Sequence, residues 1–277
     1  MSLYISSLNS GSNGNCYYIG NENDAVLIDA GLSCRETEKR MLRLGLNMKK
    51  VKAIFISHEH SDHISGLVRL SKKHQLPVYI TEETHKGGRI WLEKERINRF
   101  TTDIAIQIGE LQIMPFIKKH DAAHPHSFTV THNDVTVGIF TDIGTVCKKF
   151  ISHFKKCHAA FLESNYDKQM LMNGSYPQVL KKRISDGSGH LSNDEALDLF
   201  LNHRPSFMSH LILSHLSANN NKPELVKELF TPHANGTKII IASRFEESEV
   251  YFIQPQMING KKQKKKVEKS KQQLSLF

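Results

Sequence analysis

The chain has 277 residues, of which 39% are hydrophobic and 8% aromatic, and its formal net charge is +9. This length fits one large domain or two small ones, and the apolar content permits a hydrophobic core. No apolar run is long enough to span a bilayer, the N-terminus lacks a signal-peptide pattern, and the four cysteines form no CxxC pair. These features argue against a membrane protein and against a disulfide-rich secreted protein. They predict a cytoplasmic protein with reduced thiols.

Short apolar segments alternate with helical patterns in the first half of the chain. The predicted strands are 16–20, 25–29, 51–57 and 77–81, and the predicted helices are 35–44, 64–74 and 82–93. A polar four-residue turn joins the first two strands. In the helix 64–74, Leu67, Val68 and Leu70 are expected to face a core.

The second half of the chain contains further short strands and two clear helices. The predicted strands are 111–117, 127–131, 135–140, 159–162, 211–213 and 238–241, and the helices are 192–201 and 223–230. Ser192 and Glu195 form a capping-box pattern at the start of the first of these helices. There are no internal repeats, and no domain boundary is visible before about Gln254. We therefore expect one α/β domain over 1–255 and a tail over 256–277.

The positive charge is concentrated in that tail. Residues 261–271 contain seven lysines and one glutamate, so they contribute +6 and leave only +3 for the rest of the chain. Such segments are usually solvated and disordered, and they often bind polyanions. The tail therefore suggests contact with nucleic acid, although lysine runs are also common solubilising termini.

Four potential metal ligands lie within six residues, directly after the predicted strand 51–57. They are His58, His60, Asp62 and His63. Imidazole and carboxylate groups suit zinc, manganese or iron, and no cysteine is near. A strand places His58 and His60 on the same side, and a turn into the next helix would let Asp62 and His63 face a second ion.

Four more polar residues stand at the ends of apolar strands, where loops converge in layered folds. They are Asp29, His120, Asp142 and His215. Each of them alone is more typical of a cap or a turn, but together with the 58–63 cluster they suggest one site. His124 competes with His120 for the third position, and we prefer His120 because it directly follows a strand.

This series of motifs resembles the metallo-β-lactamase superfamily over roughly residues 1–255. The resemblance implies a four-layered αββα sandwich with a site for two divalent ions, zinc or manganese with iron as a further option. It implies that His58, His60 and His120 hold one ion and that Asp62, His63 and His215 hold the other. Asp142 would bridge the two ions, and Asp29 would hold the ligand loop without contacting an ion.

Two loops narrow the comparison to one branch of the superfamily. Small residues at 8–15 could bring backbone close to a phosphate, with Ser10, Ser12 and Asn13 as candidate contacts. The second loop, 189–193, precedes a capped helix, so His190, Ser192 and Asn193 could bind phosphate there. Both loops resemble the WalJ/YycJ-like nucleases, which implies a phosphodiester substrate and a catalytic role for His190 and Asp142.

The last five residues resemble the pentapeptide with which bacterial replication proteins bind the sliding clamp. Gln273 would bind at the mouth of the clamp pocket, and the apolar side chains would fill it. The residues concerned are Gln273, Leu274, Leu276 and Phe277. An exposed apolar end on a polar tail often marks a partner site, although it could also be an arbitrary terminus.

We therefore expect a cytoplasmic, dinuclear metal-dependent phosphodiesterase, a DNA exonuclease linked to replication or repair through the clamp. One alternative is an RNA-processing or small-phosphodiester hydrolase of the same fold. A second is a clamp- or nucleic-acid-binding protein with a structural metal site, but structural sites are usually closed and tetrahedral. The sequence does not fix the metal, the direction of digestion or the oligomeric state.

Overall fold

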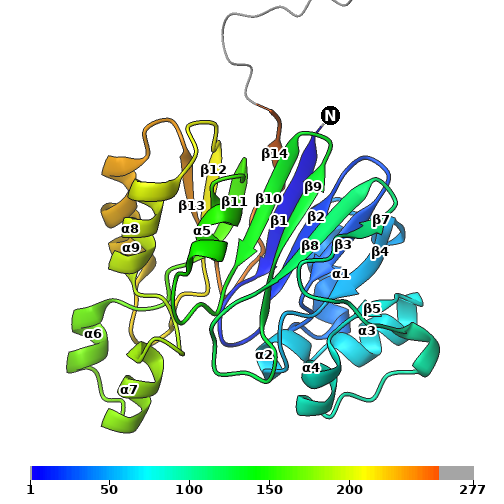
Figure 1. Ribbon diagram of the computed structural model, residues 1–277, viewed down its shortest axis with the longest axis horizontal. Coiled ribbons are helices and arrows are strands. Elements are labelled where there is room, and N and C mark those ends of the chain that lie inside the picture. Colours follow the sequence, from blue (N-terminus) through cyan, green and yellow to red (C-terminus); the bar gives the residue numbers. More distant parts are fainter. Residues whose placement is uncertain (1, 256–277) are drawn as a thin grey trace, which may run out of the picture.

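Two seven-stranded sheets pack face to face, and helices cover their outer faces (Figure 1). This architecture comes from a computed structural model that describes residues 2–255. The predicted αββα sandwich is confirmed. The predicted tail and its C-terminal pentapeptide lie outside the described residues. Within residues 2–255, no helix is long and apolar enough to cross a membrane.

The first sheet contains both ends of the described chain. Its strands, in spatial order, are β14 (Tyr251–Ile253), β1 (Leu3–Asn9), β2 (Cys16–Gly20), β3 (Ala25–Ile28), β4 (Val51–Phe55), β5 (Val78–Tyr79) and β6 (Ile97–Asn98). The strands from β14 to β3 are antiparallel, and those from β3 to β6 are parallel. The helices that follow them are α1 (Cys34–Arg43), α2 (Ser61–Ile64), α3 (Leu67–His74) and α4 (Glu82–Gly87), with short 3₁₀ turns at Met48–Lys50 and Lys94–Arg96.

The second sheet is built in the same way. Its strands, in spatial order, are β13 (Lys238–Ile241), β12 (His210–Ser214), β11 (Ala159–Glu163), β10 (Val135–Phe140), β9 (His126–His132), β8 (Leu111–Ile117) and β7 (Ile106–Ile108). The strands from β7 to β10 are antiparallel, and those from β10 to β13 are parallel. Its helices are α5 (Lys148–Phe154), α6 (Lys168–Asn173), α7 (Gln178–Ser185), α8 (Asn193–His203) and α9 (Pro223–Phe230), with a 3₁₀ turn at Thr231–His233.

Strands buried on both faces explain why the sequence shows continuous apolar runs rather than alternation. The layer between the sheets contains Tyr17, Phe55, Phe128 and Phe161 among its fully buried side chains. One further apolar layer lies between each sheet and the helices that cover it. Three apolar layers fix both sheets, so the loops at the strand ends are held on a rigid base.

The predicted helices differ from the observed ones in two places. The single helix predicted over 64–74 is instead divided between the end of α2 and α3, which begins after Gly66. Val68 is 40% exposed rather than buried. The helix predicted over 82–93 ends at Gly87, because Gly88 caps it. A Cβ on Gly88 would lie 3.2 Å from Cβ of Glu59, so this chain reversal is packed against the 58–63 loop.

Candidate metal centre

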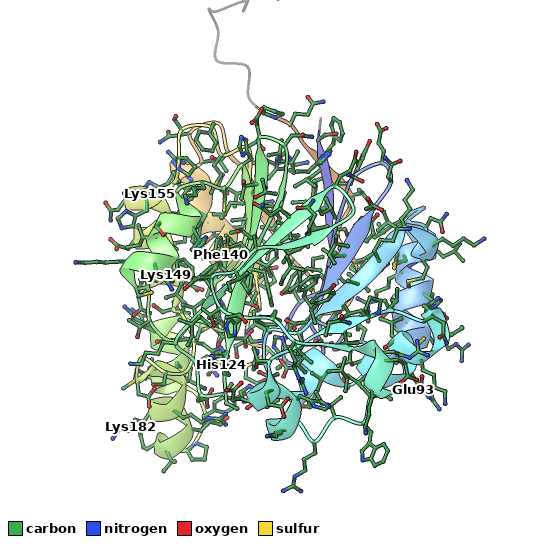
Figure 2. The ribbon with its side chains drawn as sticks, turned by 45° about the vertical axis from the view of Figure 1, so that its right-hand side comes forward. Glu93, His124, Phe140, Lys149, Lys155 and Lys182 are labelled. Carbon is green, nitrogen blue, oxygen red and sulfur yellow. The ribbon has the colours of Figure 1, made fainter. Side chains whose placement is uncertain are left out.

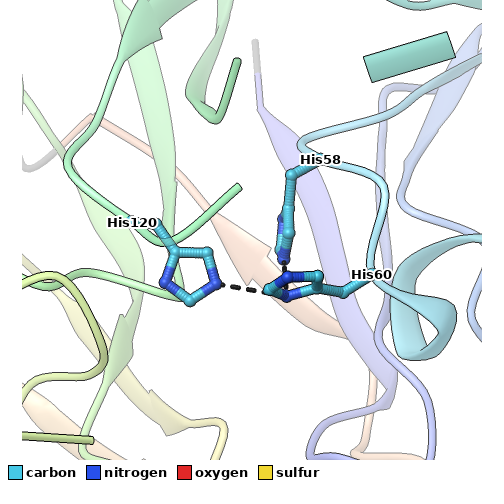
Figure 3. Close-up of side chains that lie close together, drawn as sticks. All are labelled: His58, His60 and His120. Carbon is cyan, nitrogen blue, oxygen red and sulfur yellow. Dashed lines mark hydrogen bonds between the residues drawn. The ribbon is translucent and has the colours of Figure 1, made fainter. Parts of the chain in front are cut away.

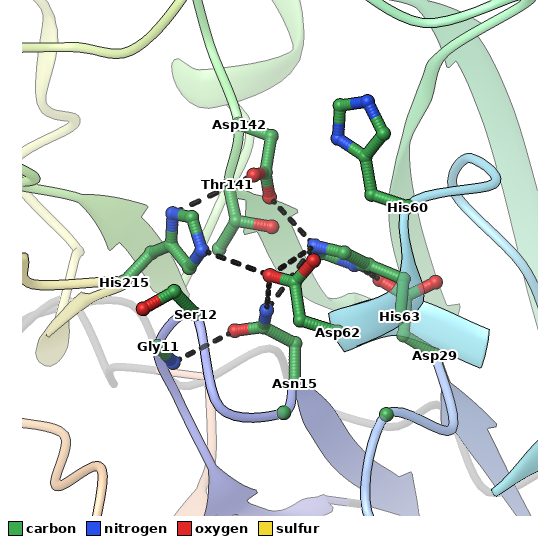
Figure 4. A network of polar contacts seen from close by, with 12 residues as sticks. Gly11, Ser12, Asn15, Asp29, His60, Asp62, His63, Thr141, Asp142 and His215 are labelled. Atoms are coloured by element: carbon green, nitrogen blue, oxygen red, sulfur yellow. Dashed lines mark hydrogen bonds and ion pairs between the residues drawn. The ribbon is translucent and has the colours of Figure 1, made fainter. Parts of the chain in front are cut away.

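Four loops at one edge of the two sheets bring all the predicted ligands together. The 58–63 loop follows β4 of the first sheet, and the others follow strands β8, β10 and β12 of the second sheet. Figure 4 shows side chains from both sheets converging on one point. Asp29, Asp142 and His215 adopt φ values of 63°, 57° and 56°, which turn the chain sharply at the strand ends. Such conformations are costly for non-glycine residues and often occur at functional sites.

His58, His60 and His120 form the first group of candidate ligands (Figure 3). Nε2 of His58 lies 3.1 Å from Nδ1 of His60, and that Nδ1 lies 3.4 Å from Nε2 of His120. Burial lowers the pKa of His58 well below its usual value and that of His120 to about 4. Both rings are therefore neutral at neutral pH, as a metal ligand must be.

His124 is not part of this group. Its Nδ1 lies 3.3 Å from a carboxylate oxygen of Glu83, and its side chain is 29% exposed (Figure 2). His120 is almost completely buried and points at His60. The structure therefore favours His120, as the position after the strand predicts.

Asp62, His63 and His215 form the second group. Nε2 of His63 lies 3.4 Å from Oδ2 of Asp62, and Nε2 of His215 lies 3.5 Å from the same oxygen. Burial opposes the charged form of both imidazoles, but the carboxylate of Asp142 dominates and raises the pKa of His63 well above its usual value. The pKa of His215 rises to about 10 for the same reason.

Asp142 lies between the two groups. Its Oδ1 is 3.8 Å from Nε2 of His120, and its Oδ2 is 3.3 Å from Nε2 of His63. Burial opposes ionisation of Asp142, but the neighbouring His215 and His63 hold its pKa well below the usual range. Oδ1 also lies 3.5 Å from Nδ1 of His215, so the carboxylate of Asp142 lies against residues of both groups.

Two buried polar atoms at the centre indicate whether metal ions fit there. Oδ2 of Asp142 and Nε2 of His215 have no hydrogen-bond partner among residues 2–255. Buried polar atoms without a partner are rare and need an explanation. A cation between the two groups would satisfy both atoms, and the mixed imidazole and carboxylate set suits zinc, manganese or iron.

In the rings of His58, His63 and His120, the nitrogen that faces away from the centre is held by a hydrogen bond. Nδ1 of His63 donates to Asp29 at 2.7 Å, and Nδ1 of His120 donates to the carbonyl of Gly189 at 2.9 Å. The hydroxyl of Ser57 lies 2.9 Å from Nδ1 of His58 and donates to Asp29 at 2.8 Å. These contacts fix the tautomers, so that Nε2 points toward the centre. Asp29 therefore lies where the resemblance places it.

Glu163 belongs to the same site, although the sequence did not single it out. Its side chain is fully buried at the end of β11. Oε1 accepts hydrogen bonds from Nδ1 of His190 at 2.8 Å and from Nδ1 of His215 at 2.9 Å. Burial opposes ionisation of Glu163, but His190 lowers its pKa to about 2. The available signal was an apolar strand that ends in an acid, the same pattern that pointed to Asp29 and Asp142.

The small-residue loop at 10–15 packs against the metal loop rather than standing free. The backbone N–H of Asn15 donates to the carbonyl of Asp62 at 2.7 Å, and its side-chain amide donates to the Asp62 carboxylate at 3.0 Å. The hydroxyl of Ser10 accepts from the N–H of His215 at 2.8 Å. Ser12 and Asn13 are exposed beside Arg244.

The second predicted phosphate loop divides into two parts. His190 is 22% exposed and lines a pocket of about 200 Å³ together with His215, Tyr176 and Arg183. Ser192 and Asn193 are buried instead. Ser192 caps α8, and Asn193 binds Ser164 and Asn221 within the protein. Of these three residues, only His190 faces the pocket.

Comparison with known proteins gives relatives that share this fold. The family model described as the metallo-beta-lactamase superfamily matches residues 10–166. Exodeoxyribonuclease YycJ of Bacillus anthracis is 36% identical over 82% of this chain and 87% of its own length. Exodeoxyribonuclease WalJ of Streptococcus pneumoniae is 30% identical over 79% of this chain and 83% of its own length. The crystal structure of the metallo-beta-lactamase fold protein YhfI from Bacillus subtilis superposes with a TM-score of 0.70 at 17% identity, covering 91% of this chain and 99% of that one.

Proposed function

Because the chain belongs to the metallo-beta-lactamase superfamily, we propose that it is a phosphodiesterase that uses two divalent ions to degrade DNA from its ends. The observation that carries this proposal is the centre itself. Seven candidate ligands from two sheets converge there, and two of their buried atoms have no hydrogen-bond partner within residues 2–255. The similarity to two exodeoxyribonucleases over most of the chain supports DNA as the substrate.

Each ion would have its own set of protein ligands. His58, His60 and His120 would hold the first, Asp62, His63 and His215 would hold the second, and Asp142 would contact both. We propose zinc or manganese, with iron as a further option, because hard and borderline cations accept such mixed nitrogen and oxygen ligands. Such ions lower the pKa of water and stabilise the charge that develops on phosphate oxygens.

His190 is the residue best placed to act on the substrate directly. Glu163 accepts a hydrogen bond from Nδ1 of His190, so this nitrogen carries the proton. Nε2 of His190 makes no hydrogen bond within residues 2–255, and the ring lines the pocket beside His215. We propose that Nε2 binds a phosphate oxygen or the leaving oxygen and stabilises its charge.

We also propose that the C-terminal segment recruits the protein to the bacterial sliding clamp during replication or repair. The basis is the sequence alone: Gln273, Leu274, Leu276 and Phe277 follow the lysine-rich segment 261–271. A weak peptide contact and a cationic arm on DNA would reinforce one another, because each raises the local concentration of the other partner.

Digestion of end-labelled oligonucleotides tests the catalytic proposal. The purified protein, reconstituted with zinc, manganese or iron, is mixed with single- and double-stranded DNA, with RNA, and with thioester and lactam substrates. We expect DNA to be shortened from an end. Faster cleavage of RNA would identify an RNA-processing enzyme, and cleavage of the thioester or lactam alone would refute a phosphodiesterase.

A further inference from the structure

The turn after β13 is tied to the metal centre through the 10–15 loop. The N–H of Ser10 donates to the carbonyl of Ser243 at 3.1 Å, and the side chain of Asn13 donates to the carbonyl of Arg244 at 2.7 Å. The contact is close, because a Cβ on Gly11 would lie 3.3 Å from Cβ of Arg244. Ser10 in turn accepts the N–H of His215. The position of Arg244 is therefore fixed relative to the metal ligands.

The guanidinium group of Arg244 lacks an anionic partner among the described residues. Nη2 lies 3.3 Å from the hydroxyl of Ser12, and Nη1 is buried without a hydrogen bond. The nearby Arg40 and Arg43 differ, since both form ion pairs with carboxylates. A buried guanidinium nitrogen needs an acceptor, and a phosphate matches its planar donors well.

Phe245 places an aromatic ring next to this cation. Its side chain is 80% exposed, and the guanidinium carbon of Arg244 lies 6.0 Å from the ring centre. The backbone of Phe245 is held, because its carbonyl accepts a hydrogen bond of 2.8 Å from Arg40. An exposed ring on a fixed backbone is a typical platform for stacking a nucleobase.

Both residues line a pocket of about 370 Å³ that adjoins the catalytic pocket. Its walls also include Ser10, Leu216 and Ser217. Leu216 and Ser217 line the pocket of about 200 Å³ that contains His190 and His215 as well. A strand that lies in the catalytic pocket can therefore continue across Ser217 to Arg244 without leaving the surface.

We propose that this second pocket binds one nucleotide of a single DNA strand beside the scissile phosphate. Arg244 binds its phosphate, and Phe245 stacks on its base. The inference rests on the proposed phosphodiesterase function and extends it, because it specifies where the substrate strand lies outside the metal centre. Base stacking needs no particular sequence, so the subsite accepts any of the four bases.

Single-position changes in the substrate test each contact. A series of single-stranded oligonucleotides carries one abasic residue, or one uncharged methylphosphonate linkage, at successive positions from the cleaved end. For the wild type, we expect the abasic residue at one position to lower kcat/KM about tenfold. Phe245→Ala should lower kcat/KM about tenfold on the complete strand, mainly through KM, and should remove the sensitivity to that abasic position. Arg244→Ala should likewise remove the sensitivity to one methylphosphonate.

Matched controls separate the subsite from general effects. Phe252→Ala removes a 44% exposed ring from β14, which pairs with the start of β1, far from the end of β1 that leads to the centre. Lys155→Ala removes one positive charge directly after α5, from a residue that lines neither of the two pockets. Both should behave like the wild type. Phe245→Tyr keeps the ring and should retain stacking.

Two outcomes would overturn the inference, and they differ. If Phe245→Ala keeps the full abasic sensitivity of the wild type, the base does not stack there, although the enzyme still cleaves DNA. If the wild type neither binds nor cleaves any oligonucleotide, the proposed function is wrong and the subsite fails with it. Metal content and circular dichroism of each variant show that the centre and the fold are intact.

Discussion

Glu163, at the end of β11, accepts a hydrogen bond of 2.9 Å from Nδ1 of His215, which directly follows the neighbouring strand β12. The two positions are adjacent in the sheet, because Glu163 pairs with Ser214 in the parallel register of β11 and β12. The other carboxylate oxygen accepts the backbone N–H groups of Ile143 and Leu191. One buried carboxylate therefore orients a proposed metal ligand and holds the loops that carry Asp142 and His190.

Glu163→Gln should weaken the second metal site. The amide keeps the size of the side chain but loses the negative charge that stabilises N–H donation from both imidazoles. We expect metal affinity or turnover to fall 10- to 100-fold, as is usual when the partner of a metal-bound histidine is changed. Metal titration followed by kinetics on DNA measures both effects. Glu224→Gln, on the exposed start of α9, is the control, and equal behaviour of the two variants would contradict the role of Glu163.

Two ions should bind to each chain. Elemental analysis after reconstitution should give a stoichiometry near two for the wild type. His215→Ala should retain the first ion, because His58, His60 and His120 are untouched. Asp142→Ala should weaken both, since its carboxylate lies against residues of both groups of proposed ligands. A wild-type stoichiometry that stays at or below one would refute the dinuclear centre.

His190→Ala should keep both ions and lose turnover by about 100-fold, the lower range for a lost acid–base or charge-stabilising group. The reason is that His190 faces the pocket and is bound to Glu163 rather than placed among the seven proposed ligands. Metal analysis and kcat measured on the same sample separate the two roles. Loss of an ion would make His190 a ligand, and unchanged turnover would leave it only a structural role.

The stability of the protein should fall at acidic pH partly because of His126. Burial lowers the pKa of His126 to about 4, and its ring is held between Thr102 and the carbonyl of His124. The unfolded chain has a histidine pKa near 6.5, so between about pH 6.5 and pH 4 the unfolded state binds the extra proton. Stability therefore falls as the pH decreases through this window, by about 2 kcal/mol at pH 4.5.

Urea unfolding at pH 7 and pH 4.5 checks this expectation. His126→Asn retains a donor toward the His124 carbonyl but does not titrate, so its loss of unfolding free energy between the two pH values should be smaller. Other histidines contribute equally to both proteins and cancel in the comparison. An identical loss in variant and wild type would assign the effect to other groups.

Deletion of residues 273–277 should abolish binding to a bacterial sliding clamp and leave the metal content and the nuclease activity on free DNA unchanged. Substituting the lysines of 261–271 should instead weaken DNA affinity and reduce its dependence on salt, because fewer counterions are released. Clamp titration with the wild type, the deletion and a Leu276→Ala/Phe277→Ala double variant compares the cases. Equal binding by all three, or none at high micromolar concentration, would reject clamp recruitment.

The sequence predicted most of the strands, and it identified the residues that the structure brings together as candidate metal ligands, for one physical reason. Strands buried on both faces must be apolar, so a polar residue at the end of such a strand is conspicuous. His58, Asp142 and His215 all have this form, and helix 223–230 and strand 238–241 have the predicted bounds. Glu163 also ends an apolar strand, but no other candidate ligand lies beside it in the sequence, so the pattern alone did not identify it.

The remaining features depend on contacts between distant segments. Arg244 lies beside the 10–15 loop although more than 200 residues separate them, and no local pattern reports such a contact. The helices α6 and α7 are short and mostly exposed, so they lack the apolar periodicity from which longer helices are predicted. The position of Ser192 and Asn193 at a helix N-terminus predicts phosphate contacts, but the same residue types also cap helices, and here Ser192 caps α8 while Asn193 is buried.

The pairing of β1 with β14 has a consequence for biosynthesis. Tyr4 lies opposite Phe252, so the first sheet is complete only after about 250 residues have been translated. The ligand His58 is made early, whereas His215 is made more than 150 residues later, on the other sheet. Contacts of such large sequence separation form late in folding. A nascent chain therefore carries His58, His60 and His63 before Asp142 and His215 exist, so the proposed centre can be assembled only after nearly the whole domain has been translated.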